Sequence, residues 1–130
     1  MNTERIVRTL PKVRMQPNPA EKWQIVHDAR GYFAVEWIDV NAMSAAERAE
    51  CESAPEPDAE QAKYERAQIP RFPSEIGAIE WALLQDEEEC VDEELSAFNA
   101  PSECYADVHR SIERRRKALL KKATEQENQS

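Results

Sequence analysis

Apolar and polar side chains alternate most clearly between Lys22 and Val40. The alternating positions are Trp23, Ile25 and His27 in a first run and Phe33, Val35 and Trp37 in a second. A period of two is typical of strands with one buried face, and aromatic and β-branched residues favour strands. The four residues from Asp28 to Gly31 separate the two runs and suit a type I hairpin connection. The pattern therefore predicts an antiparallel β-hairpin.

The first 20 residues carry scattered apolar side chains between basic ones and end in Pro17-Asn18-Pro19. Pro11 would interrupt a long helix here, because proline lacks the backbone N–H and clashes with the preceding turn. We expect residues 1–20 to form a basic N-terminal arm or an edge strand beside the hairpin.

Helical spacing begins after residue 43. Ser44 and Glu47 have the spacing of a capping box, which predicts a short helix to about Cys51, and Asp58 is placed to cap a second. After Ser74, a third cap, Ile76, Ile79 and Leu83 recur at i, i+3 and i+7 with Ala82 beside them, so we expect them to face the core.

The main helix is predicted over residues 74–86, because four acidic residues follow it from Asp86 to Glu89. Like charges at i and i+4 destabilise a helix, so a break or fray is expected at this point. A last helix is predicted over 102–122, starting at Pro101-Ser102, with a frayed polar tail over 124–130. Its apolar stripe contains Tyr105, Val108, Ile112 and Leu119, with Leu120 alongside.

These elements predict one α+β domain over residues 1–130, with an N-terminal β-hairpin or short sheet packed against two main helices. The length of 130 residues fits a single domain with one core. Most aromatic side chains, including Phe72, Trp81, Phe98 and Tyr105, are expected in that core.

The charge is unevenly distributed along the chain, whose formal net charge is −9. Residues 1–43 have a net charge of +1, residues 44–109 have 4 basic and 18 acidic side chains, and residues 110–130 have a net charge of +4. An acidic middle is thus followed by a basic helix.

The acidic middle favours a non-enzymatic binding protein that docks on a basic, nucleic-acid-binding partner, because rows of carboxylates can imitate nucleic acid. In size and charge the chain resembles small accessory proteins of phages, including inhibitors of host defence such as anti-CRISPR or anti-restriction proteins. Trp23 and Tyr32, on strand ends, are candidate anchors of such an interface. The acidic candidates are Glu87, Glu88, Glu89, Asp92, Glu93 and Glu94. A solvated face that keeps the protein soluble is the alternative.

The basic helix supports a second hypothesis, in which the protein is a nucleic-acid-binding or regulatory module. Its candidate residues lie at i, i+4, i+7 and i+11, and they are Arg110, Arg114, Lys117 and Lys121. The alternative is that the same cations pair with the acidic segment inside the fold. A third hypothesis is a structural subunit that self-assembles through the edge of the β-hairpin.

Several chemistries lack their usual residues. Two glycines cannot supply a P-loop or a dinucleotide-binding fingerprint, and no zinc, di-iron or EF-hand motif occurs, so no metal, cofactor or catalytic residue is predicted. Cys104 and His109 lie five residues apart, which places them on different faces of a helix. Three cysteines without C-x-x-C spacing, no apolar leader and no membrane-spanning run predict a cytoplasmic protein with reduced thiols.

Overall fold

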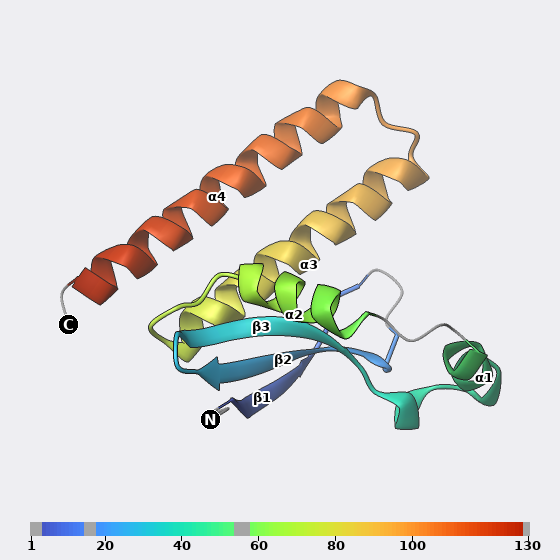
Figure 1. Ribbon diagram of the computed structural model, residues 1–130. Helices are drawn as coiled ribbons and strands as arrows, with labels where there is room; N and C mark the ends of the chain where they lie inside the picture. The colour runs from blue at the N-terminus through green and yellow to red at the C-terminus, as the bar shows by residue number, and fades with distance from the viewer. Residues whose placement is uncertain (1–3, 15–17, 54–57, 129–130) are drawn as a thin grey trace.

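A three-stranded antiparallel sheet is followed by two short and two long helices in the computed structural model, which describes residues 4–14, 18–53 and 58–128 (Figure 1). This arrangement confirms the predicted α+β class. The strands are β1 (Arg5–Pro11), β2 (Glu21–Asp28) and β3 (Gly31–Ile38). The helices are α1 (Ala45–Ser53), α2 (Ala59–Gln68), α3 (Glu75–Ala97) and α4 (Ser102–Asn128), and a 3₁₀ turn, η1, covers Val40–Ala42.

The predicted hairpin is formed by β2 and β3, which pair from Glu21–Ile38 to Asp28–Gly31. Asp28 Oδ1 accepts hydrogen bonds from the backbone N–H groups of Arg30 and Gly31, at 2.9 and 3.2 Å. Gly31 has a φ of 135°, and a Cβ atom there would lie 2.6 Å from the carbonyl oxygen of Phe72. The turn therefore requires glycine on both conformational and steric grounds.

The N-terminal segment forms an edge strand, as expected, since β1 pairs antiparallel with β2 and the order is β1-β2-β3. A register shift between Ile6 and Arg8 places a bulge at Val7. Such bulges and the charged residues Arg5 and Arg8 are typical protections of an exposed sheet edge.

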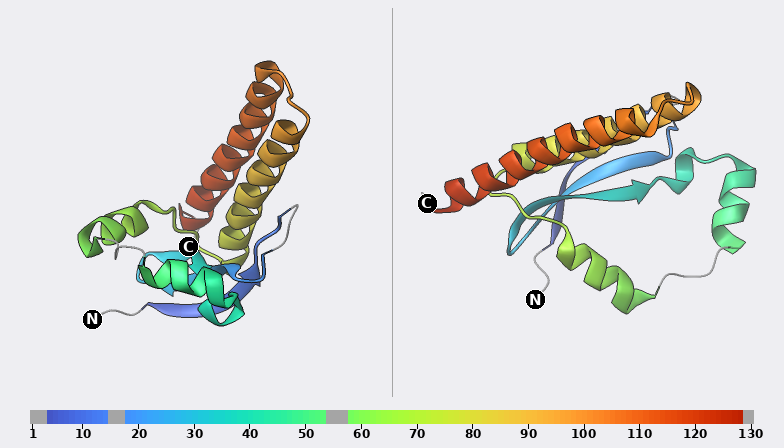
Figure 2. Two further views of the ribbon diagram at one scale, coloured as in Figure 1. Left: turned by 90° about the vertical axis from the view of Figure 1, so that its right-hand side faces the viewer. Right: turned by 90° about the horizontal axis from the view of Figure 1, so that it is seen from above.

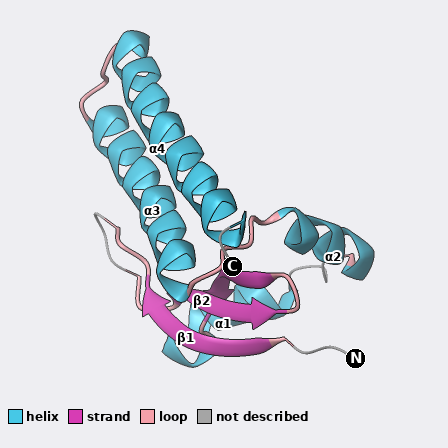
Figure 3. Ribbon diagram, turned by 90° about the vertical axis from the view of Figure 1, so that its left-hand side faces the viewer, coloured by secondary structure: helices cyan, strands magenta, loops and turns pink. Residues whose placement is uncertain are grey.

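The long helices lie on one side of the sheet and α2 lies on the other, whereas α1 lies beyond the end of β3 (Figure 2). α3 packs on β2 and β3, whereas α4 packs mainly on α3. Together α3 and α4 form a helical hairpin whose far end projects away from the sheet (Figures 1 and 3). Its tip therefore lies away from the sheet and from the core cluster.

The core between α3 and the sheet confirms part of the predicted apolar face of α3, since Ala82 is in the core and Ile79 packs against it, but Ile76 and Leu83 lie outside it. Ala78 and Ala82 are buried at 0% and 1% exposure, whereas Ile76 and Leu83 are 67% and 50% exposed. Small alanine side chains let α3 approach the sheet closely, and Gly77 lies against the ring of Phe72. The helix is thus rotated relative to the prediction. The core cluster consists of Trp23, Ile25, Ala34, Phe72, Ala78, Ala82, Leu84, Leu119 and Ala123.

The opposite side of the sheet is covered by arginine side chains. Val26 and Phe33 are fully buried there, and the guanidinium groups of Arg71 and Arg66 lie 3.8 and 5.3 Å from the ring centroid of Phe33. Arg71 also donates to Asp28 Oδ2 through Nε and Nη2, at 3.2 and 2.9 Å. These cation–π contacts and the ion pair tie the end of α2 to the hairpin turn.

The predicted helix caps are confirmed, but two predicted helix ends are wrong. Ser44, Asp58 and Ser74 each accept a backbone N–H from the first turn that follows. α3 continues through the acidic block to Ala97 without the expected break, for reasons given below. α4 runs to Asn128, so the tail predicted to fray from residue 124 is helical; residues 129–130 lie outside the described part.

Candidate functional site

The charged residues that the sequence singles out lie on the helical hairpin, and three of the six acidic ones, Glu87, Glu88 and Asp92, contact α4. Arg115 Nη1 donates to Glu87 Oε1 at 2.8 Å, and its Nη2 pairs with the second oxygen. This bidentate hydrogen bond from Arg115 lowers the pKa of the Glu87 carboxyl. Arginine and carboxylate match each other in shape at such a pair.

Arg116 forms the centre of a polar network between the two helices. Its Nη2 donates to Gln85 Oε1 at 2.7 Å and to Glu88 Oε1 at 3.1 Å, and its Nη1 donates to Glu113 at 2.5 Å. The Arg116 side chain is 16% exposed. Burial is the largest influence on it and lowers its pKa, but the bonds to Glu88 and Glu113 outweigh this and leave the pKa raised. The guanidinium therefore stays charged within the interface.

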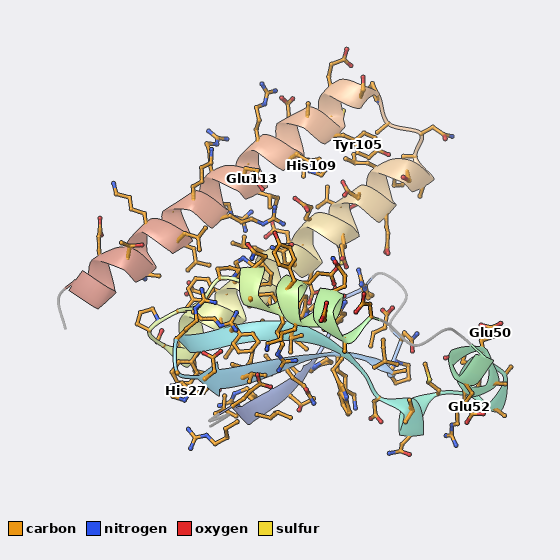
Figure 4. The ribbon with its side chains drawn as sticks, in the orientation of Figure 1. His27, Glu50, Glu52, Tyr105, His109 and Glu113 are labelled. Carbon is orange, nitrogen blue, oxygen red and sulfur yellow. The ribbon has the colours of Figure 1, made fainter. Side chains whose placement is uncertain are left out.

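His109 extends the network toward the tip (Figure 4). Its Nε2 lies 3.0 Å from Asp92 Oδ1, and its Nδ1 lies 3.4 Å from Glu88 Oε2. One turn farther out, the Tyr105 hydroxyl lies 3.1 Å from Ser96 Oγ. Polar side chains thus bridge the two helices in the half of the α3–α4 interface that lies beyond the sheet, around the fully buried Ile112.

Two further acidic side chains are held by the N-terminal arm. Arg14 pairs with Glu89 of α3 and, at 3.3 Å, with Glu21 of β2. Asp86, at 1% exposure, accepts the Trp23 Nε1–H and the backbone N–H of Val13, both at 2.9 Å. Sequence reasoning missed both contacts, because each joins segments that are far apart in the chain.

These pairs explain why α3 continues through its acidic block. Four of the six predicted binding carboxylates, Glu87, Glu88, Glu89 and Asp92, have a cationic or imidazole partner. The like-charge repulsion that would break the helix is thereby offset. The expected internal pairing of the basic helix is observed for Arg115 and Arg116, which lie beside the four predicted nucleic-acid contacts rather than among them.

The two predicted aromatic anchors differ in exposure. Trp23 is 4% exposed, since its indole packs edge-to-face on Trp81 with ring centroids 6.3 Å apart and donates to Asp86. Tyr32 is half-buried against the core and pairs with Phe72 through the backbone. Trp23 is thus enclosed by the fold, whereas a contact through Tyr32 stays a prediction.

The tip of the hairpin holds an aromatic residue that sequence reasoning placed in the core. Phe98 is 78% exposed, as the cap of α3, and Asn99 follows it with a φ of 50°. Glu93, Glu94 and Glu103 are exposed around this turn. None of the three forms an ion pair with another described residue. The sequence signal for this exposed position was that Phe98 directly precedes Asn-Ala-Pro, which is typical of a turn after a helix.

The predicted basic row lies on the solvent face of α4, where all four side chains are exposed. Arg110 pairs with Asp107, one turn earlier. Within the described residues no ion pair involves Arg114, Lys117 or Lys121. The row from Arg110 to Lys121 extends for about 17 Å along the helix.

Cysteine, histidine and acidic side chains are the usual components of catalytic and metal-binding sites. Cys90 and Cys104 form no disulfide, and Cys104 is exposed on another face of α4 than His109; the Cys51 side chain lies outside the description. Across the described ranges no group of three His, Cys, Asp or Glu side chains is placed to hold a metal ion. None of the described helices is both long and apolar enough to cross a bilayer.

No protein-family model, curated protein or solved structure matches this chain.

Proposed function

We propose that this protein is a non-enzymatic binding protein that docks on a basic protein surface through the tip of its helical hairpin. The observation that carries the proposal is the exposed Phe98, flanked by Glu93, Glu94 and Glu103, three carboxylates that pair with no cation among the described residues. An exposed aromatic side chain surrounded by charged residues is a common form of binding hot spot. The aromatic contact supplies affinity, and the charges orient the partner.

The basic partner is chosen because of the charge at the tip. From Asp86 to Asp107 the chain has nine acidic residues and no Lys or Arg. The pairs described above neutralise the side of this segment that faces α4 and the arm, so the remaining negative charge is concentrated at Glu93, Glu94 and Glu103. A nucleic-acid-binding protein offers the complementary surface, and occlusion of its site is the inhibitory action that we propose.

The test is capture of partners on the immobilised protein, followed by elution with a DNA duplex. We expect Glu93→Lys with Glu94→Lys, and separately Phe98→Ala, to abolish capture, and DNA to displace the captured protein from the parent chain. The matched control is Glu47→Lys with Glu52→Lys, which makes the same charge change on the exposed surface of α1. Equal losses in the control and tip variants would refute a role for the tip.

The basic row on α4 supports a second candidate function, direct binding of nucleic acid. Three cations without ion pairs on one helix face can neutralise several phosphates, and each phosphate contact makes binding more sensitive to salt. We expect a DNA duplex to be retarded in gels at low salt, and Arg114→Glu with Lys117→Glu to remove the retardation. The control is Arg48→Glu with Lys63→Glu, on α1 and α2. Absence of retardation by the parent chain at low salt would rule this function out.

A further inference from the structure

An apolar groove lies between α3 and α4 in the half of the hairpin that is nearer the sheet. It consists of a hollow of about 400 Å³, walled by Leu83 and Leu84 on α3 and Ala118 and Leu119 on α4, and an adjoining hollow of about 320 Å³ that reaches Ile76. Glu80, Leu119 and Lys122 line both hollows, so the two are continuous.

The rim of the groove carries the largest apolar side chains of α3 that do not enter the core. Ile76 and Leu83 are 67% and 50% exposed and lie seven residues apart, on one face of the helix. Single exposed apolar residues are ordinary on protein surfaces, but a ridge of two that continues into an apolar groove marks an interaction site.

The charges along the groove have opposite signs on its two walls. Glu80 lies on the α3 wall between Ile76 and Leu83, and Lys122 lies on the α4 wall. Both are exposed, and in the described part of the chain neither takes part in an ion pair. At the outer end, the Glu87–Arg115 pair closes the groove.

We infer that this groove binds a second copy of the chain in a two-fold symmetric dimer. A two-fold interface must be self-complementary. If one residue contacts a second residue on the partner, that second residue contacts the first one in the symmetry-related position. Here the acidic wall of each copy would face the basic wall of the other, and the Ile76–Leu83 ridge of each would enter the other's groove. A partner of one charge sign would be opposed by one of the two walls, which is why a copy of the same chain fits best.

The inference is independent of the tip, so its test uses oligomeric state alone. Sedimentation equilibrium over a wide concentration range should show a reversible monomer–dimer equilibrium. Leu83→Glu should remove the dimer, because it places two charges in the apolar interface. Circular dichroism should show the variant folded, since Leu83 lies outside the core. Tyr64→Glu, at a residue of α2 that is 63% exposed, is the matched control and should leave the dimer intact.

A charge exchange tests the proposed pairing directly. Glu80→Lys alone and Lys122→Glu alone should each weaken the dimer about tenfold or more, because each turns two symmetry-related attractions into repulsions. Mixed together, the two variants should form a heterodimer of near-parental affinity, since lysines of one chain then face glutamates of the other.

Three results would overturn the inference. The first is a monomer at every concentration of the parent chain. The second is a dimer that survives Leu83→Glu, which would place the contact elsewhere, for example at the β1 edge. The third is a mixture of the two charge variants that associates no better than either variant alone.

Discussion

Asp86 is a carboxylate in an apolar core, and it stays there because both of its oxygens are occupied. One accepts the indole N–H of Trp23 and the other accepts the backbone N–H of Val13. A buried charge without partners would be strongly unfavourable, whereas one with well-placed donors is tolerated. Asp86 thereby fastens the N-terminal arm and β2 to α3.

We predict that Asp86→Ala lowers the free energy of unfolding by about 3 kcal/mol, because it leaves two buried donors unsatisfied. Asp86→Asn should cost less, because it keeps one acceptor oxygen. Urea denaturation followed by tryptophan fluorescence measures both. Glu94→Ala, an exposed position of the same helix, is the control and should change the stability by less than about 0.5 kcal/mol. A loss as small for Asp86→Ala as for the control would contradict this role.

Asp28 gives a prediction about pH. Burial, the largest single influence, raises its pKa, but the hydrogen bonds from Arg71 and from the backbone of Arg30 and Gly31 outweigh it and lower the pKa below its ordinary value. A carboxyl whose pKa is lower in the folded state than in the unfolded state stabilises the fold at pH values above the unfolded-state pKa. This stabilisation is lost as the pH falls through the folded-state pKa.

Asp28→Asn should therefore be less stable than the parent at neutral pH. The difference should shrink as the pH falls below about 4, where the parent carboxyl also becomes neutral. Urea midpoints of the two proteins across the acid range measure the effect. A difference that stays constant down to the lowest pH would show that the Asp28 charge does not contribute.

At the scale of elements, α3 and α4 stabilise each other through charge as much as through apolar contact. Apolar contact is concentrated in the half near the sheet, with Ala82, Leu84 and Leu119, and continues outward to the fully buried Ile112. In the outer half, arginine and histidine of α4 bind carboxylates of α3. The outer half of α3 therefore depends on α4 for its helical structure.

Arg114 and Arg116 of α4 allow a matched test of this dependence. Arg116→Ala removes three hydrogen bonds at a mostly buried side chain and should lower the free energy of unfolding by about 2 kcal/mol. Arg114→Ala removes the same charge from an exposed position and should change it by less than about 0.5 kcal/mol. Chemical denaturation of the two variants provides the comparison. Equal effects would mean that net charge, rather than the network, stabilises the hairpin.

How far the sequence predicts this fold depends on the range of each interaction. The caps Ser74 and Asp58 were predictable, because a capping residue and its N–H partner lie within one turn. The face of α3 that packs on the sheet was not fully predictable. Close approach to the sheet at Ala78 and Ala82 outweighs the larger apolar surface of Ile76 and Leu83.

The candidate site was predictable only as a list of charges. Glu93, Glu94 and the row from Arg110 to Lys121 are exposed as expected. The pairing of Glu89 with Arg14, 75 residues away, has no local signal in the sequence. The exposed position of Phe98 depends on where the hairpin turns, which the apolar pattern alone did not reveal.

At the scale of the whole molecule, the parts differ in how firmly they are held. All described side chains of α1 are exposed, and α1 stands apart from the sheet and the helical hairpin (Figures 1 and 2). Local unfolding of an element with few buried contacts costs little free energy.

We predict a gradient of amide hydrogen exchange across the chain. Exchange should be fastest in α1, intermediate in the outer half of α3 and slowest in β2 and in α3 around Ala78 and Ala82. Mass spectrometry of peptides from the exchanged protein resolves these segments. Protection of α1 equal to that of β2 would contradict the gradient.

The bond between Asp86 and Trp23 also orders events during synthesis of the chain. The two residues are 63 positions apart, and at 5–20 residues per second a ribosome needs about 3–12 s to make that stretch. A β-hairpin forms within microseconds, so β2 and β3 can pair long before α3 exists to cover them. During that interval Trp23, Ile25 and Ala34 lack the α3 side chains that cover them in the folded protein.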